Sequence, residues 1–159
     1  MSTYLPLVTA IITTYRRQPD IVGRAINSII NQTYKNIEII VVDDSPPTYE
    51  RRNDVRRLVE SYDKSIIYIQ HEKNMGACVA RNTGLKMAMG EFVAYLDDDD
   101  EWMDTKIEKQ LACFTRDDVA VVYCGRVIKE DSTGRIRKTK CIYCEGDIYK
   151  EKGCFYPIG

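Results

Sequence analysis

Short apolar runs alternate along the chain with longer segments in which apolar residues recur every three or four positions. The runs are rich in Val and Ile, which is typical of buried strands, and the longer segments have the period of helices that bury one face. The predicted strands cover residues 8–12, 37–42, 66–70 and 91–96. The predicted helices cover residues 20–32, 49–62, 76–89 and 103–114. We expect Asp20 to cap the first helix and Gly90 to close the third.

Four strand–helix pairs in succession predict an α/β fold, with a mostly parallel sheet flanked by helices on both faces. Residues 120–127 and 135–143 are predicted to pair as a hairpin around a turn at residues 131–134. We expect one domain that divides into a first part, about 1–115, and the start of a second region, about 116–159. The chain ends without a closing element, which favours a fold truncated at its C-terminus.

The overall composition suits one globular domain and excludes several other classes of protein. The 159 residues are 44% hydrophobic and 30% charged, with a formal net charge of −1. A chain without a basic field is not expected to bind nucleic acid. No apolar segment is long enough to span a membrane, and the first residues lack the pattern of a signal peptide. We therefore expect a cytoplasmic protein, with peripheral membrane association as an open alternative.

Six cysteines are present, and the cytosol would keep them reduced. Cys78 and Cys113 lie among apolar neighbours in predicted helices, so we expect them to be small core residues. A zinc site would need four ligands, and its candidates are Cys124, Cys141, Cys144 and Cys154. We favour unpaired structural cysteines over zinc.

Polar residues follow all four predicted strands. They are Thr13 to Tyr15, Asp43 and Asp44, His71 and Asn74, and Asp97 to Glu101. Open α/β sheets bind ligands outside the carboxyl ends of their parallel strands. Each of these polar groups alone could be a turn or a helix cap, but four together predict a binding site at one edge of the sheet.

Five consecutive acids, residues 97–101, give the strongest single signal. If this segment is extended, Asp97 and Asp99 face the same side and can converge on one point. Mg²⁺ and Mn²⁺ prefer such oxygen ligands and commonly share them with a substrate diphosphate. The alternative is a solvated acidic loop in which Asp100 caps the next helix.

Other residues at the same edge have the chemistry of nucleotide binding. Asp44 can accept hydrogen bonds from a base or ribose, although an aspartate turn into Pro46 is the alternative at this position. Thr13 and Tyr15 can line a base pocket. Arg81, on the third predicted helix, can reach the nucleotide or pair with a nearby acid. We interpret Arg16 and Arg17 as surface charges.

Several segments, taken in order, carry a resemblance to a known family. They are IITTY at residues 11–15, SIINQTY at 28–34, EIIVVDDS at 38–45, NMG at 74–76, ARNTG at 80–84 and GEFVAYLDDDDEW at 90–102. In this order, over about residues 8–110, the chain resembles family 2 glycosyltransferases. The resemblance weakens after Phe114.

The resemblance implies a GT-A fold, which is Rossmann-like, and the transfer of a sugar from a nucleoside diphosphate sugar to an acceptor hydroxyl. It also implies inversion at the anomeric carbon, Mn²⁺ or Mg²⁺ as cofactor, and a carbohydrate or lipid-linked acceptor in polysaccharide or glycoconjugate biosynthesis. UDP is the most frequent nucleotide in the family, with GDP and dTDP as alternatives.

The resemblance also implies roles for individual residues. Three positions match those that hold the base and ribose: Thr13, Tyr15 and Asp44. Arg81 matches a position that often lies near the nucleotide, and we count Asp97 and Asp98 as further nucleotide-binding candidates. Asp97 and Asp99 match the outer residues of the DxD motif, with Asp99 as the direct metal ligand. Arg16 departs from the family, which frequently has asparagine there, and no residue after Phe114 is assigned as the catalytic base.

Three alternatives to a glycosyltransferase have some support in the sequence. A nucleotidyltransferase acting on a sugar phosphate would usually have a glycine-rich, basic loop after the first strand, and residues 13–17 contain no glycine. A phosphate-receiver domain would have its acidic pair after the first strand, whereas Asp43 and Asp44 follow the second. A non-catalytic nucleotide-binding module remains open because no catalytic base is assigned.

Overall fold

The computed structural model describes residues 4–63, 65–130 and 132–138. The chain divides into two compact units, residues 1–112 and residues 113–159.

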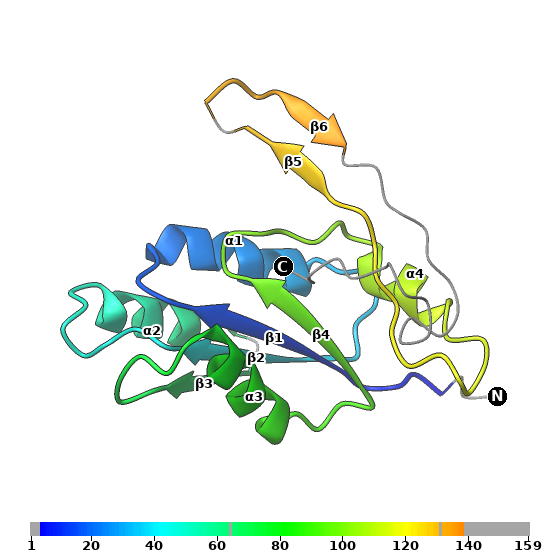
Figure 1. Ribbon diagram of the computed structural model, residues 1–159, viewed down its shortest axis with the longest axis horizontal. Helices are drawn as coiled ribbons and strands as arrows, with labels where there is room; N and C mark the ends of the chain where they lie inside the picture. The colour runs from blue at the N-terminus through cyan, green and yellow to red at the C-terminus, as the bar shows by residue number, and fades with distance from the viewer. Residues whose placement is uncertain (1–3, 64, 131, 139–159) are drawn as a thin grey trace, which may run out of the picture. The chain divides into compact units, whose positions relative to one another are not determined.

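The first unit contains a four-stranded sheet in the order β3-β2-β1-β4 (Figure 1). The strands are β1 (Val8–Thr14), β2 (Ile37–Asp43), β3 (Ile66–Gln70) and β4 (Phe92–Asp97). Every pairing between neighbouring strands is parallel. The central strands β1 and β2 are buried almost throughout, which explains their nearly continuous Val and Ile. The predicted parallel α/β sheet is confirmed.

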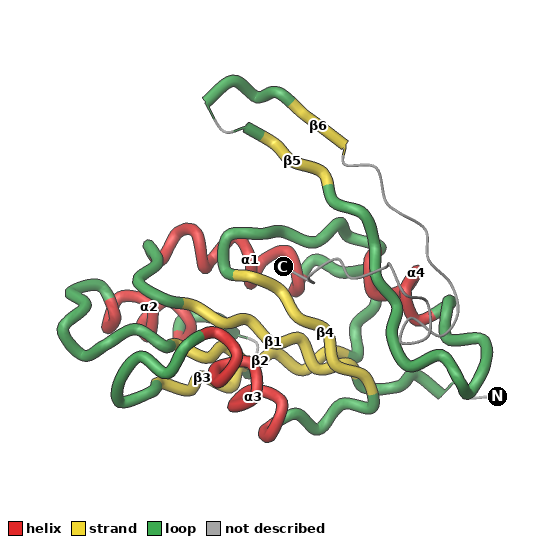
Figure 2. The backbone as a smooth tube through the Cα atoms, viewed as in Figure 1, coloured by secondary structure: helices red, strands yellow, loops and turns green. Residues whose placement is uncertain are grey.

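Helices cover both faces of this sheet (Figure 2). They are α1 (Pro19–Ile30), α2 (Arg52–Glu60), α3 (Ala77–Met87) and α4 (Lys106–Leu111). Apolar side chains of α1, α2 and α4 share one core cluster with alternate residues of the strands. On the other face, α3 buries Ala80 against Ile11 and Ile40 in a smaller cluster. The period of two along each strand therefore supplies both cores.

The register of the sheet brings the strand ends to one edge. Thr14 of β1 pairs with Asp43 of β2, and Asp43 pairs with Gln70 of β3. On the other side of β1, Thr13 pairs with Asp97 of β4. The polar residues that follow the four strands therefore lie along the same edge, as the sequence predicts.

Two buried polar side chains tie the end of α1 to the segment that follows the acidic run. The Gln32 side chain is fully buried; its Nε2 donates to the carbonyls of Ser28 and Met103, and its Oε1 accepts the Ile107 N–H. The Ser28 hydroxyl accepts the Trp102 N–H at 3.0 Å. Residues 102–107 are thus fixed to a helix more than seventy positions earlier in the chain.

Two predicted helix ends are wrong. Gln18 is the N-cap residue of α1, Pro19 begins the helix, and Asp20 lies within its first turn rather than at the cap. Proline fits the first helical position because its φ is already helical and the missing N–H would have no partner there. Helix α3 ends at Met87 and Ala88 is extended, so Gly90 does not close it. Instead, a Cβ at Gly90 would lie 2.6 Å from the Thr9 backbone N, which explains why glycine is required there.

The expectation that Cys78 and Cys113 belong to the core is also wrong, since both are exposed. The buried positions of α3 are Ala80 and Gly84, one turn apart. Cys78 is two residues from Ala80, and two residues rotate an α-helix by about 200°. Cys78 therefore lies on the opposite face, and Cys113 follows the end of α4, which is shorter than predicted.

The second unit contains an antiparallel hairpin of β5 (Val127–Lys129) and β6 (Ile136–Lys138). Strand β5 begins where the predicted strand 120–127 was to end, and residues 139–143 of the second predicted strand lie outside the described residues. The connection is closed by hydrogen bonds from the Glu130 N–H to the Arg135 carbonyl and from the Gly134 N–H to the Glu130 carbonyl. Cys124 is exposed, and the other zinc candidates, Cys141, Cys144 and Cys154, lie outside the described residues. Within the described ranges, no helix has the length and hydropathy needed to cross a membrane.

Candidate functional site

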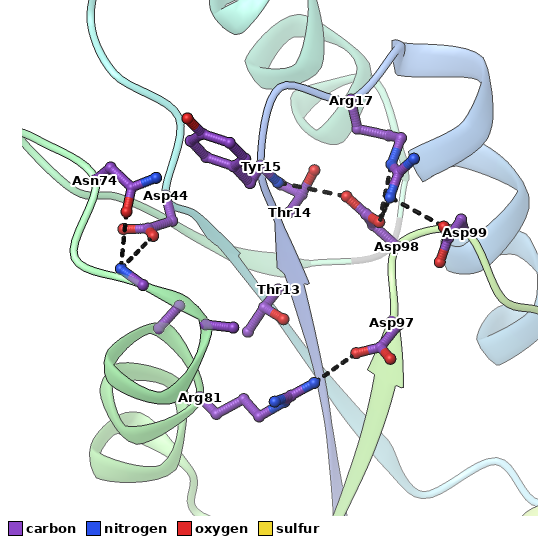
Figure 3. Close-up of a pocket in the computed structure, with 13 residues that line it drawn as sticks. Thr13, Thr14, Tyr15, Arg17, Asp44, Asn74, Arg81, Asp97, Asp98 and Asp99 are labelled. Carbon is purple, nitrogen blue, oxygen red and sulfur yellow. Dashed lines mark hydrogen bonds and ion pairs between the residues drawn. The ribbon is translucent and has the colours of Figure 1, made fainter. Parts of the chain in front are cut away.

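A pocket of about 370 Å³ lies at the carboxyl edge of the parallel sheet (Figure 3). Its lining comes from the ends of β1, β2 and β4, the loop after β3, and the start of α3. The residues are Thr13, Thr14, Tyr15, Arg17, Asp44, Asn74, Gly76, Ala77, Ala80, Arg81, Asp97, Asp98 and Asp99. The lining includes all the residues predicted to bind nucleotide or metal, which are Thr13, Tyr15, Asp44, Arg81, Asp97, Asp98 and Asp99. Of the other polar residues that follow the strands, Asp43, His71, Asp100 and Glu101 are not part of it.

The Asp44 carboxylate is buried on one side of the pocket and accepts hydrogen bonds from three groups. Its Oδ1 lies 2.7 Å from His71 Nδ1 and 2.8 Å from the Met75 N, and its Oδ2 lies 2.8 Å from the Gly76 N. Gly76 has a φ of 88°, a conformation that other residues rarely adopt, and this lets the loop turn its N–H groups toward Asp44. Asp44 thereby joins the end of β2 to the start of α3.

Burial acts to raise the pKa of Asp44, but the hydrogen bonds from His71, Met75 and Gly76 outweigh it. The pKa of this carboxyl is therefore lowered from its ordinary value. Asp44 is a carboxylate at neutral pH, so it presents only acceptors to the pocket. The neighbouring Asp43 is not part of the pocket lining. Its side chain accepts hydrogen bonds from the Ser45 N–H and the Tyr68 hydroxyl.

The acidic residues on the other side of the pocket are paired with two arginines. Arg17 lies 2.8 Å from Asp98 Oδ1 and 3.0 Å from Asp99 Oδ2. Arg81, reaching across from α3, lies 2.8 Å from Asp97 Oδ1 (Figure 3). Asp98 is nearly buried and also accepts the Tyr15 N–H at 3.4 Å. The arginines neutralise charges that would otherwise repel one another.

The acidic segment is not extended, so the argument that an extended backbone points Asp97 and Asp99 to the same side does not hold. Strand β4 ends at Asp97, and Asp98 and Asp99 form a turn that the Asp100 N–H closes on the Asp97 carbonyl. The side chains of Asp97 and Asp99 are 43% and 54% exposed, so both are accessible from the pocket. Asp100 does not cap the following helix, because α4 begins at Lys106 with Thr105 as its N-cap residue.

The donor set decides what kind of metal site this pocket can form. The described residues contain no group of three or more His, Cys, Asp or Glu side chains placed to hold a metal ion. Two accessible carboxylates, Asp97 and Asp99, are the kind of partial ligand set that Mg²⁺ completes with substrate phosphates and water. The residues therefore fit a divalent metal that is shared with a ligand, and not a site made by protein groups alone.

The sequence did not predict the contacts or burial of three residues in or beside the pocket. Arg17, interpreted as a surface charge, pairs with two acids more than eighty positions away. The Thr14 hydroxyl is buried beside the pocket and, within the part of the chain that the structure describes, has no hydrogen-bond partner. His71 contacts Asp44 directly. The strand-end pattern indicates His71 and Thr14, but nothing local to Arg17 indicates its partners.

Comparison with known proteins identifies the class that this fold and pocket define. The family model for glycosyl transferase family 2 matches residues 9–157, so the chain belongs to family 2 of the glycosyltransferases. Its fold is the GT-A type, in keeping with the solved structures that it matches. Family membership favours the glycosyltransferase interpretation over the nucleotidyltransferase and the phosphate-receiver domain.

Individual relatives give a more detailed comparison. The chain is 34% identical over 134 residues to TuaG of Bacillus subtilis (strain 168), whose name refers to teichuronic acid biosynthesis; this covers 84% of the chain and 52% of TuaG. It is 37% identical over 129 residues to the UDP-Glc:alpha-D-GlcNAc-diphosphoundecaprenol beta-1,3-glucosyltransferase WfaP of Escherichia coli, covering 80% of the chain and 49% of WfaP. The chain thus spans about half the length of these relatives.

A solved structure supports the same assignment. The mannosyltransferase PcManGT from Pyrobaculum calidifontis, in complex with GDP-Man and Mn²⁺, matches with a TM-score of 0.55 and 31% identity. The match covers 63% of this chain and 29% of that one. In that protein, a nucleoside diphosphate sugar and a divalent metal are bound together.

Proposed function

We propose that this chain supplies the nucleotide-sugar site of a metal-dependent glycosyltransferase that acts in polysaccharide or glycoconjugate biosynthesis. One observation carries the proposal. A carboxylate, Asp44, and an acid–arginine cluster containing Arg81 and Asp99 line opposite parts of one pocket at the carboxyl edge of a family 2 chain. An acceptor carboxylate at one part of the pocket and charged groups at the opposite part suit a ligand with a base at one end and a diphosphate at the other.

The base end of the ligand would meet Asp44, Thr13 and Tyr15. Because Asp44 is an acceptor only, it suits a base with a ring N–H on its pairing edge, as in uracil, thymine or guanine. UDP-Glc in the name of WfaP and GDP-Man in the PcManGT complex are both compatible with this preference. We propose UDP first, on family frequency.

The diphosphate end would lie beside Arg81, Asp97 and Asp99. Asp99, helped by Asp97, would hold Mn²⁺ or Mg²⁺ together with the diphosphate, and such a metal stabilises negative charge on a leaving group. Arg81 is free to turn from Asp97 to the phosphate oxygens, where its guanidinium would neutralise charge as the sugar–oxygen bond breaks. Arg17 keeps Asp98 fixed beside the Tyr15 backbone and so preserves the shape of the pocket.

An acceptor hydroxyl would attack the anomeric carbon from the face opposite the nucleotide, which inverts its configuration. We propose a carbohydrate or lipid-linked acceptor, in line with the diphosphoundecaprenol in the name of WfaP. The acceptor would be bound by the region that begins near residue 116, and the catalytic base is not assigned. The cytoplasmic location and any peripheral membrane association stay predictions.

Isothermal titration calorimetry tests the donor site directly. UDP, GDP and dTDP are titrated with and without Mn²⁺ into the wild-type chain, an Asp99→Ala variant and an Asp104→Ala variant. Asp104 is an exposed acid outside the pocket, so its replacement gives the same change in charge. We expect Mn²⁺-dependent binding that Asp99→Ala loses and Asp104→Ala keeps. A folded wild-type chain that binds no nucleotide would contradict the proposal.

A further inference from the structure

His71 is the only histidine in the chain, and its ring is held between Asp44 and α3. Its Nδ1 lies 2.7 Å from Asp44 Oδ1 and its Nε2 lies 2.9 Å from Thr83 Oγ1. The backbone is fixed as well, because the His71 N–H donates to the Asp43 carbonyl and the His71 carbonyl accepts from Arg52. With its side chain only 12% exposed, the ring has little freedom to leave this position.

The hydrogen-bond pattern around Thr83 determines what His71 offers to Asp44. The Thr83 hydroxyl donates to the Val79 carbonyl at 3.0 Å, so its oxygen is an acceptor for an Nε2–H of His71. An Nδ1 without a proton would then repel the Asp44 carboxylate, so in this arrangement both ring nitrogens carry protons. If the Thr83 hydroxyl instead turns to donate to Nε2, the ring is neutral and its proton is on Nδ1.

Both arrangements place an Nδ1–H against Asp44. Thr83 can act as donor or acceptor, so the contact between His71 and Asp44 does not depend on the charge of the ring. A histidine held in this way is a constant donor to the carboxylate.

Asp44 has one acceptor position left for a ligand. A carboxylate offers about four acceptor sites. Two on Oδ1 are used by His71 and Met75, and one on Oδ2 is used by Gly76. One acceptor site on Oδ2 is left, and Asp44 lines the pocket, so a ligand there can use this site. The three donors thus set the direction in which Asp44 can accept one further N–H.

We propose that His71 is a positioning residue that, supported by Thr83, orients the Asp44 carboxylate to accept an N–H from the nucleobase. The inference rests on the proposed nucleotide site, and it adds a residue that acts on base selection without touching the base. His71 would therefore affect the choice of base and leave the diphosphate end of the site unchanged.

Matched nucleotides separate this role from a general effect on folding. UDP and 3-methyl-UDP, which lacks the N3–H, are titrated with Mn²⁺ into wild type, His71→Leu and His71→Asn. Asparagine can place an N–H near the position of Nδ1, whereas leucine cannot donate. We expect His71→Leu to weaken UDP binding by roughly tenfold, the effect of misaligning one hydrogen bond to a charged group, and His71→Asn to recover most of it. Binding of 3-methyl-UDP should be weak and the same in all three chains.

If wild type prefers guanine, the same comparison uses GDP and 1-methyl-GDP. An equal loss for the methylated and unmethylated nucleotide, or no loss in His71→Leu, overturns the proposal.

A second measurement needs no nucleotide, so it tests the role of His71 separately from the proposed nucleotide-sugar site. Amide hydrogen exchange at Met75 and Gly76 reports whether their bonds to Asp44 persist. We expect faster exchange in His71→Leu and exchange close to wild type in His71→Asn. If wild type binds no nucleotide, the proposed function fails, and this exchange still decides the role of His71. Unchanged exchange in His71→Leu would show that His71 does not order this loop.

Discussion

The Gln32 side chain offers a sharp test of how the acidic segment is anchored. Replacing it by leucine keeps most of the side-chain volume but removes its donor and its acceptor. The Ile107 N–H and the Ser28 carbonyl then lose the partner that the structure gives them. The Met103 carbonyl is less affected, since it also accepts the Lys106 N–H at 2.9 Å.

The size of the effect follows from the two polar groups left without a partner. Leaving a buried donor or acceptor unsatisfied costs about 1–3 kcal/mol, so Gln32→Leu should lower the free energy of unfolding by about 2–6 kcal/mol. Small domains are stable by only about 5–15 kcal/mol, so the loss is a large fraction of the total. The site should suffer too, because Trp102 and Met103 directly follow the acidic run.

Urea unfolding followed by the fluorescence of Trp102 measures this loss. Trp102 is the only tryptophan and is 8% exposed, so its emission reports on the segment that Gln32 holds. Asn27→Leu is the matched control, since it replaces an amide by leucine at an exposed position of α1, the helix that Gln32 follows. We expect the control to change stability by less than about 0.5 kcal/mol. A loss below about 1 kcal/mol in Gln32→Leu would refute the argument from unsatisfied groups.

Three further predictions concern the strain and charge of the site. Arg16 has a φ of 50°, which asparagine tolerates better than arginine, so Arg16→Asn should raise the free energy of unfolding by about 1 kcal/mol in urea; an unchanged midpoint would contradict this. Because its pKa is lowered, Asp44 stabilises the fold fully above the ordinary aspartate pKa of about 4 and loses this effect as the pH falls through its folded value. The stability gap between wild type and Asp44→Asn should therefore stay constant from pH 7 to about pH 5 and shrink as the pH falls below about 4, and a gap that stays constant at low pH would refute the assignment. Arg17→Met removes a cation that competes with a metal for Asp99, so calorimetry should find Mn²⁺ binding several-fold tighter; weaker binding would contradict this and mean that the contact of Arg17 with Asp98 matters more to the metal site than the competition.

The amino-acid sequence by itself determined the elements and their order. The β-branched runs at residues 37–42 and 66–70 form strands because continuous Val and Ile suit a sheet covered on both faces. Alternation of strands and helices then leaves a parallel sheet as the consistent arrangement, and parallel strands carry their carboxyl ends to one edge. For this reason Thr13, Tyr15, Asp44, Asn74 and Asp97 to Asp99, which line the pocket, could be predicted from their places at the strand ends.

Only the tertiary structure decided which of these groups meet. Arg17 has the sequence context of an exposed loop, yet Asp98 and Asp99 become its partners because β1 and β4 are neighbours in the sheet. The turn at Asp98 and the exposure of Cys78 were likewise not determined locally. Periodicity shows that a helix has a buried face, but the neighbouring sheet selects which residues occupy it. Contacts between residues distant in the sequence depend on strand order and register, which local patterns do not specify.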